Sequence, residues 1–213
     1  MSVHQSEALT LRAYPYSESH KIVVFLTRRF GKVRGVAHGV QKARSRFSGS
    51  LEPLTHVRLT FSRKEHQELA VIRNCEIVQA FPAYQLSWEV NLHFSYFSEL
   101  LMEFSKEEED SELLFRLSLA VLQASQELPI ELLARYFELW ILKLEGVLPP
   151  LDQKLTPELA LKVSGMMKLQ VAEVETVGLS QQECKRLESL CSELVECHLE
   201  KRLKTRKFLT QLL

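Results

Sequence analysis

The chain has 213 residues, 46% hydrophobic and 25% charged, with seven Gly and seven Pro, a composition that excludes collagen-like, low-complexity and intrinsically disordered proteins. A chain of this length buries enough apolar surface to fold as one large or two small domains without disulfides or metals. Its formal net charge of zero conceals two opposite halves: residues 1–80 carry thirteen Lys and Arg against six Glu, and residues 81–213 carry fourteen against twenty-one acidic residues.

The first eighty residues show the period of two that half-buried strands require, because successive side chains in a strand point to opposite faces. The pattern predicts five strands, at residues 8–14, 22–26, 33–38, 56–62 and 69–78. In the first of them Leu9, Leu11 and Ala13 alternate with other residues, so these three side chains are expected to share one face. Five short strands with Gly and Pro at the joints favour a closed barrel, since closure removes the edges of an antiparallel sheet, and the OB-fold is the leading candidate.

Beyond residue 80 the apolar residues recur every three to four positions, which is the period of helices. Helices are expected at residues 87–105, 112–127, 130–145, 157–170 and 181–204, followed by a short C-terminal turn. Two helix starts carry capping signals, Thr156 before Pro157 and Ser180 three residues before Glu183.

These patterns predict a β + α protein of two domains, an N-terminal five-stranded OB-fold barrel in residues 1–80 and an all-α helical domain in residues 81–213. The acidic run at residues 107–110 is expected to be a solvated loop. Because its acidic excess repels phosphates, the helical half is interpreted as a scaffold and a protein-binding surface. The basic end of the chain, residues 201–207, either extends a nucleic-acid path or opposes the dipole of the preceding helix.

The segment from Lys32 to Phe47 is the strongest functional signal, because it is rich in cations and contains no acidic residue. Strand alternation places Lys32, Arg34 and His38 on one face, in a row that could follow a phosphate backbone. In the loop that follows, cations are interleaved with an aromatic ring, the combination that binds single-stranded nucleic acid. The candidate DNA-binding residues are Lys32, Arg34, His38, Lys42, Arg44, Arg46 and Phe47. The alternative is a solvated loop whose Phe47 belongs to the core.

Nothing in the sequence indicates a metal site, a catalytic site or a cofactor. The four cysteines, Cys75, Cys184, Cys191 and Cys197, include no CxxC pair and are interpreted as reduced thiols in the core. Cys184 and Cys191 would lie about 10 Å apart on one helix face, too far apart to bind one tetrahedral zinc ion. Dispersed histidines and the lack of a glycine loop or a nucleophile motif predict a protein that is not an enzyme. With no signal-peptide pattern and no long apolar stretch, a cytoplasmic location is expected.

Residues 8–53, ALTLRAYPYSESHKIVVFLTRRFGKVRGVAHGVQKARSRFSGSLEP, contain a Tyr-Pro-Tyr turn, a Gly-Lys-Val-Arg-Gly-Val-Ala strand and a Ser-Arg-Phe loop before Leu-Glu-Pro. This segment resembles the start of the RecO family of bacterial DNA repair proteins. The passage IVQAFPAY, at residues 77–84, resembles the family's transition from barrel to helices, and residues 136–149 resemble its later helix that ends in Gly and Pro.

The resemblance implies an OB-fold domain, a helical domain and a non-catalytic role in DNA repair and recombination as a recombination mediator. It implies binding of single- and double-stranded DNA, annealing of complementary strands and, together with RecR, loading of RecA onto DNA coated by the single-stranded DNA-binding protein. The implied location is cytoplasmic and nucleoid-associated. The C-terminal tail of the single-stranded DNA-binding protein, which is apolar and acidic, would need a groove edged by cations, for which Arg116, Arg135 and Lys143 are candidates.

The chain departs from the resemblance at the zinc site. Many family members hold a four-cysteine zinc site just after the helix that ends in Gly and Pro. Here the sequence continues from Leu148 without a cysteine until Cys184, so no zinc is expected.

Two other functions stay open at this point. The basic barrel could bind an acidic protein tail in a non-enzymatic adaptor, or it could bind structured RNA as an RNA-binding OB protein. The charge asymmetry indicates a polyanion partner for the basic half, and it is also compatible with two domains that dock on each other.

Overall fold

The computed structural model describes residues 2–40, 45–64, 67–82, 85 and 87–212, with the backbone alone for residues 210–212. The chain divides into two compact units. The first contains Met1–Ser87 and Phe94–Arg116, and the second contains Trp88–His93 and Leu117–Leu213. The predicted division into residues 1–80 and 81–213 stays a prediction.

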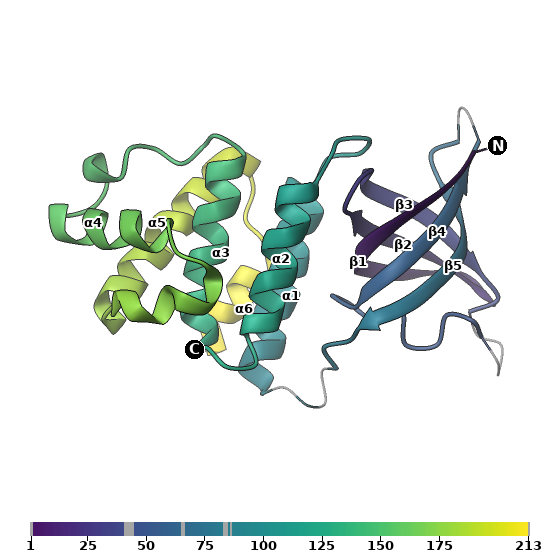
Figure 1. Ribbon diagram of the computed structural model, residues 1–213, viewed down its shortest axis with the longest axis horizontal. Helices are drawn as coiled ribbons and strands as arrows, with labels where there is room; N and C mark the ends of the chain where they lie inside the picture. The colour runs from purple at the N-terminus through teal and green to yellow at the C-terminus, as the bar shows by residue number, and fades with distance from the viewer. Residues whose placement is uncertain (1, 41–44, 65–66, 83–84, 86, 213) are drawn as a thin grey trace. The chain divides into compact units, whose positions relative to one another are not determined.

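The first unit is built on a five-stranded closed barrel (Figure 1). Its strands are β1 (Ser2–Ser17), β2 (His20–Thr27), β3 (Gly31–His38), β4 (His56–Arg63) and β5 (Ala70–Gln79). The order around the barrel is β1-β2-β3-β5-β4, antiparallel throughout except for the short parallel pairing of β3 with β5. The predicted N-terminal five-stranded OB-fold barrel is confirmed, and β1 begins six residues earlier than its pattern indicated.

The barrel core follows the predicted alternation in β4 but departs from it in β1. Val57, Leu59 and Phe61 of β4 all belong to the core. In β1 the pairing with β2 shifts register between Thr10 and Arg12, so a bulge reverses the alternation there. The shared face predicted for Leu9, Leu11 and Ala13 is therefore wrong.

The bulge sorts the β1 side chains between the inside and the outside of the barrel. Before it, Leu9 pairs with Leu26 on the outer side, and after it, Ala13 pairs with Val23 and packs against the core. Leu9 and Leu11 are fully buried outside the barrel core. The Ser98 hydroxyl donates a hydrogen bond of 2.6 Å to the Leu11 carbonyl, which fixes part of α1 (Trp88–Phe104) over this strand.

The segment between α1 and α2 (Glu112–Ala124) docks on the edge of β3. The Lys32 amide donates to the Lys106 carbonyl at 2.7 Å, and Gly31 forms an isolated antiparallel bridge with Glu107. Arg63 forms an ion pair of 2.7 Å with Glu108. The acidic run at 107–110, predicted to be a solvated loop, is thus held against the barrel although its side chains are exposed.

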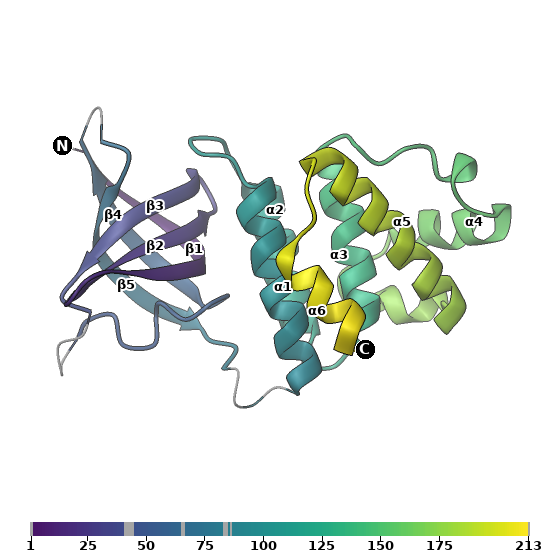
Figure 2. The ribbon, with the colours of Figure 1, turned by 180° about the vertical axis from the view of Figure 1, so that it is seen from behind.

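The second unit is all helical, as predicted (Figure 2). After the end of α2 it contains α3 (Ile130–Leu144), η2 (Leu151–Gln153), α4 (Pro157–Met166), η3 (Val171–Val177), α5 (Gln181–Leu199) and α6 (Lys204–Leu212). The central helix α3 packs against α5 and η3. The Thr156 hydroxyl caps α4, and Ser180 and Glu183 form the predicted capping box at the start of α5.

The helix predicted at 181–204 ends at Leu199, because Glu200 adopts a left-handed conformation, and the predicted short C-terminal turn is the helix α6. Arg206 of α6 is only 8% exposed and donates to the fully buried carboxylate of Glu138 at 3.0 Å. Arg135, 4% exposed, forms a second ion pair with Glu138 at 2.9 Å. Arg135 and Arg206 are thus not simple surface charges, since both stabilise the interior of this unit; both also line a pocket there, so Arg135 as a groove edge stays a prediction. A buried carboxylate requires such partners.

We predict that Gly31→Ala destabilises the protein more than Gly49→Ala does. Both glycines have positive φ, which costs an L-residue about 1–2 kcal/mol. A Cβ on Gly31 would also collide with the Lys106 carbonyl oxygen and lie 2.6 Å from that of Glu109, whereas on Gly49 it would make an ordinary contact. Urea denaturation followed by circular dichroism measures both free energies of unfolding. Equal losses would contradict the docking of the α1–α2 segment on β3.

Candidate nucleic-acid interface

The outer face of β3 carries the first group of predicted site residues. Val33 and Ala37 point into the barrel core, so the alternate residues Lys32, Arg34, Val36 and His38 lie on the outer face. Arg34 and His38 are exposed there. The Lys32 ammonium group instead donates to the Met102 carbonyl at 2.9 Å, so its charge stabilises the C-terminal end of α1.

A cluster of nitrogen-bearing side chains surrounds His38. Its ring makes an edge contact with the ring of His20, which lies opposite it on β2, at 4.5 Å between centroids. Burial lowers the pKa of His38, and the charges of His20, Arg46 and Arg73 lower it further. His38 is therefore less protonated at neutral pH than an ordinary histidine, and Arg46 and Arg73 supply lasting positive charge beside it.

The loop after β3 is only partly described. Lys42 and Arg44, two of the predicted DNA-binding residues, lie outside the described residues. Phe47 is 2% exposed and belongs to the barrel core, so its ring has no free face for a base. Phe47 is thus core, the alternative that the sequence left open. The Arg46 guanidinium lies over this ring, 4.9 Å from its centroid, which positions its charge beside the barrel.

Two exposed aromatic rings of the barrel lie on β1, where the sequence patterns did not place them. Tyr14 is 37% exposed and Tyr16 58% exposed. The guanidinium of Arg12 lies 5.1 Å from the centre of the Tyr14 ring. Arg12 and Arg34 are both paired with Val24, so they lie on the same outer side of the sheet. The signal that could have found these residues is the Tyr-Pro-Tyr motif, read together with the bulge that turns it outward.

We call this surface the outer basic-aromatic face, made of Arg12, Tyr14, Tyr16, Arg34, His38 and Arg46. Cations that neutralise phosphates and exposed rings on which bases stack are the two parts of a single-strand binding surface. The outer side of strands β2 and β3 is also where OB-folds bind oligonucleotides. Fold and surface together define a candidate nucleic-acid-binding protein of the OB class.

Two sequence models of known families match the chain. "Recombination protein O N terminal" matches residues 1–81, and "Recombination protein O C terminal" matches residues 85–158. The chain belongs to the RecO family.

Curated relatives agree with this assignment. Proteins described as "DNA repair protein RecO" are 37% identical over 147 residues in Koribacter versatilis, 39% over 152 in Syntrophus aciditrophicus and 36% over 153 in Pelotomaculum thermopropionicum. These matches cover 69%, 71% and 72% of this chain, and 60%, 59% and 59% of the respective relatives. The matched region thus spans about 60% of the length of the relatives.

The cysteines are only partly where they were expected. All four are free thiols, and Cys75 and Cys191 are buried. Burial raises the pKa of Cys75 to about 11, so its thiol is unreactive at neutral pH. Cys197 is exposed, so its predicted place in the core is wrong.

Within the described part of the chain, no three His, Cys, Asp or Glu side chains come together as metal ligands would. None of the helices there has the length and apolar character needed to cross a membrane.

We predict that Arg46→Gln raises the pKa of His38 toward its ordinary value of 6.5, because it removes a positive charge that acts on the ring. NMR titration of the ring protons measures this pKa. Arg202→Gln, which removes an exposed charge from the second unit, is the control and should leave it unchanged. An unaltered His38 titration in Arg46→Gln would show that Arg46 does not face this cluster.

Proposed function

We propose that this chain is a non-catalytic DNA-binding and strand-annealing factor in DNA repair and homologous recombination. In this proposal residues 1–80 bind single- and double-stranded DNA, and residues 81–213 form the helical domain. The observation that carries the proposal is the outer basic-aromatic face on an OB barrel in a chain of the RecO family. The names of the curated relatives support the repair role.

Annealing follows from the chemistry of this face. Two DNA strands repel each other through their phosphates, and arginines that neutralise phosphates lower that repulsion. Arg34 is exposed, and Arg46 is placed by its contact with Phe47. Tyr14 and Tyr16 offer ring faces to the bases of one strand without occupying their hydrogen-bonding edges. A strand held in this way can still pair with its complement.

The helical domain is the proposed site for protein partners. Residues 81–213 carry twenty-one acidic residues against fourteen Lys and Arg, and this excess of negative charge disfavours phosphate binding. By the family resemblance, these partners are RecR and the C-terminal tail of the single-stranded DNA-binding protein, and RecA is loaded as the outcome. Such a protein acts in the cytoplasm, at the nucleoid.

We predict that replacing Arg34 and Arg46 together by Gln weakens binding of a labelled single-stranded oligonucleotide about tenfold and makes the salt slope shallower by about 1.4, or about 0.7 for each lost phosphate contact. Fluorescence anisotropy across a salt series measures both quantities. The control removes two exposed charges elsewhere, Arg58→Gln with Arg202→Gln, and should leave the slope nearly unchanged.

Three outcomes would overturn the proposal in different ways. If the wild type does not bind the oligonucleotide at low salt, the barrel is not a DNA-binding domain. The alternative function, an adaptor that binds an acidic protein tail, is then favoured. If both double variants lose the same affinity, binding does not depend on the outer basic-aromatic face. If a structured RNA displaces the oligonucleotide at much lower concentration, the ligand is RNA.

A further inference from the structure

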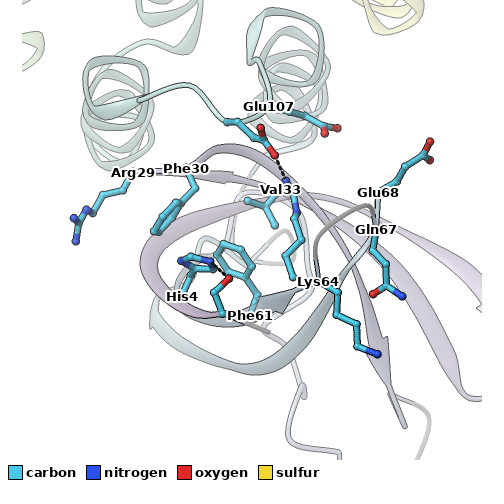
Figure 3. Close-up of a pocket in the computed structure, with 12 residues that line it drawn as sticks. His4, Arg29, Phe30, Val33, Phe61, Lys64, Gln67, Glu68 and Glu107 are labelled. Carbon is cyan, nitrogen blue, oxygen red and sulfur yellow. Dashed lines mark hydrogen bonds and ion pairs between the residues drawn. The ribbon is translucent and has the colours of Figure 1, made fainter.

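A cavity of about 860 Å³ opens at the end of the barrel where β1 and β3 begin (Figure 3). Its floor is aromatic. The ring of His4 lies 5.0 Å from that of Phe30 and 5.3 Å from that of Phe61, and the two phenylalanine rings are 5.6 Å apart. Phe61 and the neighbouring Val33 belong to the barrel core, so the floor rests on rigid structure, whereas His4 and Phe30 are partly exposed.

The rim of the cavity carries both signs of charge and an unused donor. Arg29, Arg63 and Lys64 line it together with Glu68, Glu107 and Glu108. One Arg63 nitrogen is bound to Glu108 at 2.7 Å, but its Nε is buried and finds no hydrogen-bond partner in the described part of the chain. A buried donor of this kind requires an acceptor, and a ligand in the cavity can supply one.

We propose that this cavity binds one unpaired nucleobase of a DNA strand held by the barrel. A nucleobase is flat and stacks on aromatic rings, and its edge offers acceptors to the Arg63 Nε and donors to a carboxylate. The proposal rests on the proposed function, because the base belongs to the strand that the outer basic-aromatic face holds. Val33 lines the cavity and is next in sequence to the outward-facing Arg34, so the two sites share strand β3.

The mixed charge of the rim argues against other ligands. The three carboxylates at the rim offset its three cations, so the rim has no net positive charge to attract a free phosphate or an acidic peptide into the cavity. A nucleotide instead presents a neutral base to the floor and keeps its phosphates outside the cavity, where Arg29 and Lys64 can neutralise them. The volume is also within the range of pockets that enclose small organic ligands.

The test uses single-stranded oligonucleotides with 2-aminopurine at one position at a time, because stacking quenches the fluorescence of this base. With the wild type, we expect strong quenching at one position. Phe30→Leu should restore that fluorescence and weaken binding about tenfold, as expected for the loss of one stacked base. Gln67→Ala, a change at an exposed rim residue that leaves the floor intact, should weaken binding less and keep most of the quenching.

Phe208→Leu is the matched control, since Phe208 is an exposed ring on α6 in the second unit. This substitution should change neither the quenching nor the affinity for the oligonucleotide. Oligonucleotides that bind without quenching at any position, or whose quenching survives Phe30→Leu in a folded variant, would overturn the nucleobase site and leave the proposed function standing. If the oligonucleotides do not bind the wild type at all, both proposals fall.

Discussion

The surface of the barrel depends on a single extra residue in β1. If the strand alternated regularly, Arg12 and Tyr14 would share the inner side with Thr10 and would have to be buried in the core. The bulge between Thr10 and Arg12 places Ala13 inside instead and turns the two larger side chains outward. The same side of the sheet is apolar and buried at Leu9 and basic and aromatic beyond the bulge. One backbone irregularity thus separates a packing surface from a binding surface.

The distribution of charge partners decides which cations are available to a ligand. Arg28 donates to both oxygens of Glu112, which raises the pKa of Arg28 and lowers that of Glu112. Arg63 is engaged by Glu108, and two arginines of the second unit, Arg135 and Arg206, are buried around Glu138. A count of basic residues therefore overestimates the binding surface. What distinguishes Arg34 is its exposure on a strand whose outer side also carries His38.

The order of strands and helices could be predicted from sequence, because alternation, helical period and caps are local signals. The burial of Phe47 could not, since its core partners come from other strands. The same holds for Arg206, whose acidic partner Glu138 is 68 residues away. The bulge in β1 could not be predicted, because it leaves the apolar pattern of residues 8–14 intact and changes only how the strand pairs with β2. Tyr14 and Tyr16 were visible as a motif, but the outward direction of Tyr14 depends on that bulge, and Tyr16 lies at a second register shift, between Pro15 and Ser17.

The most direct test of the binding surface is an NMR titration of the ¹⁵N-labelled protein with a short single-stranded oligonucleotide. If the outer basic-aromatic face binds the strand, the amide shifts that change should cluster at residues 12–16 of β1, 21–24 of β2 and 34–38 of β3. Smaller changes should reach residues 29–33 at the cavity. Shifts confined to β4, β5 or the second unit would show that DNA binds elsewhere and would contradict the account.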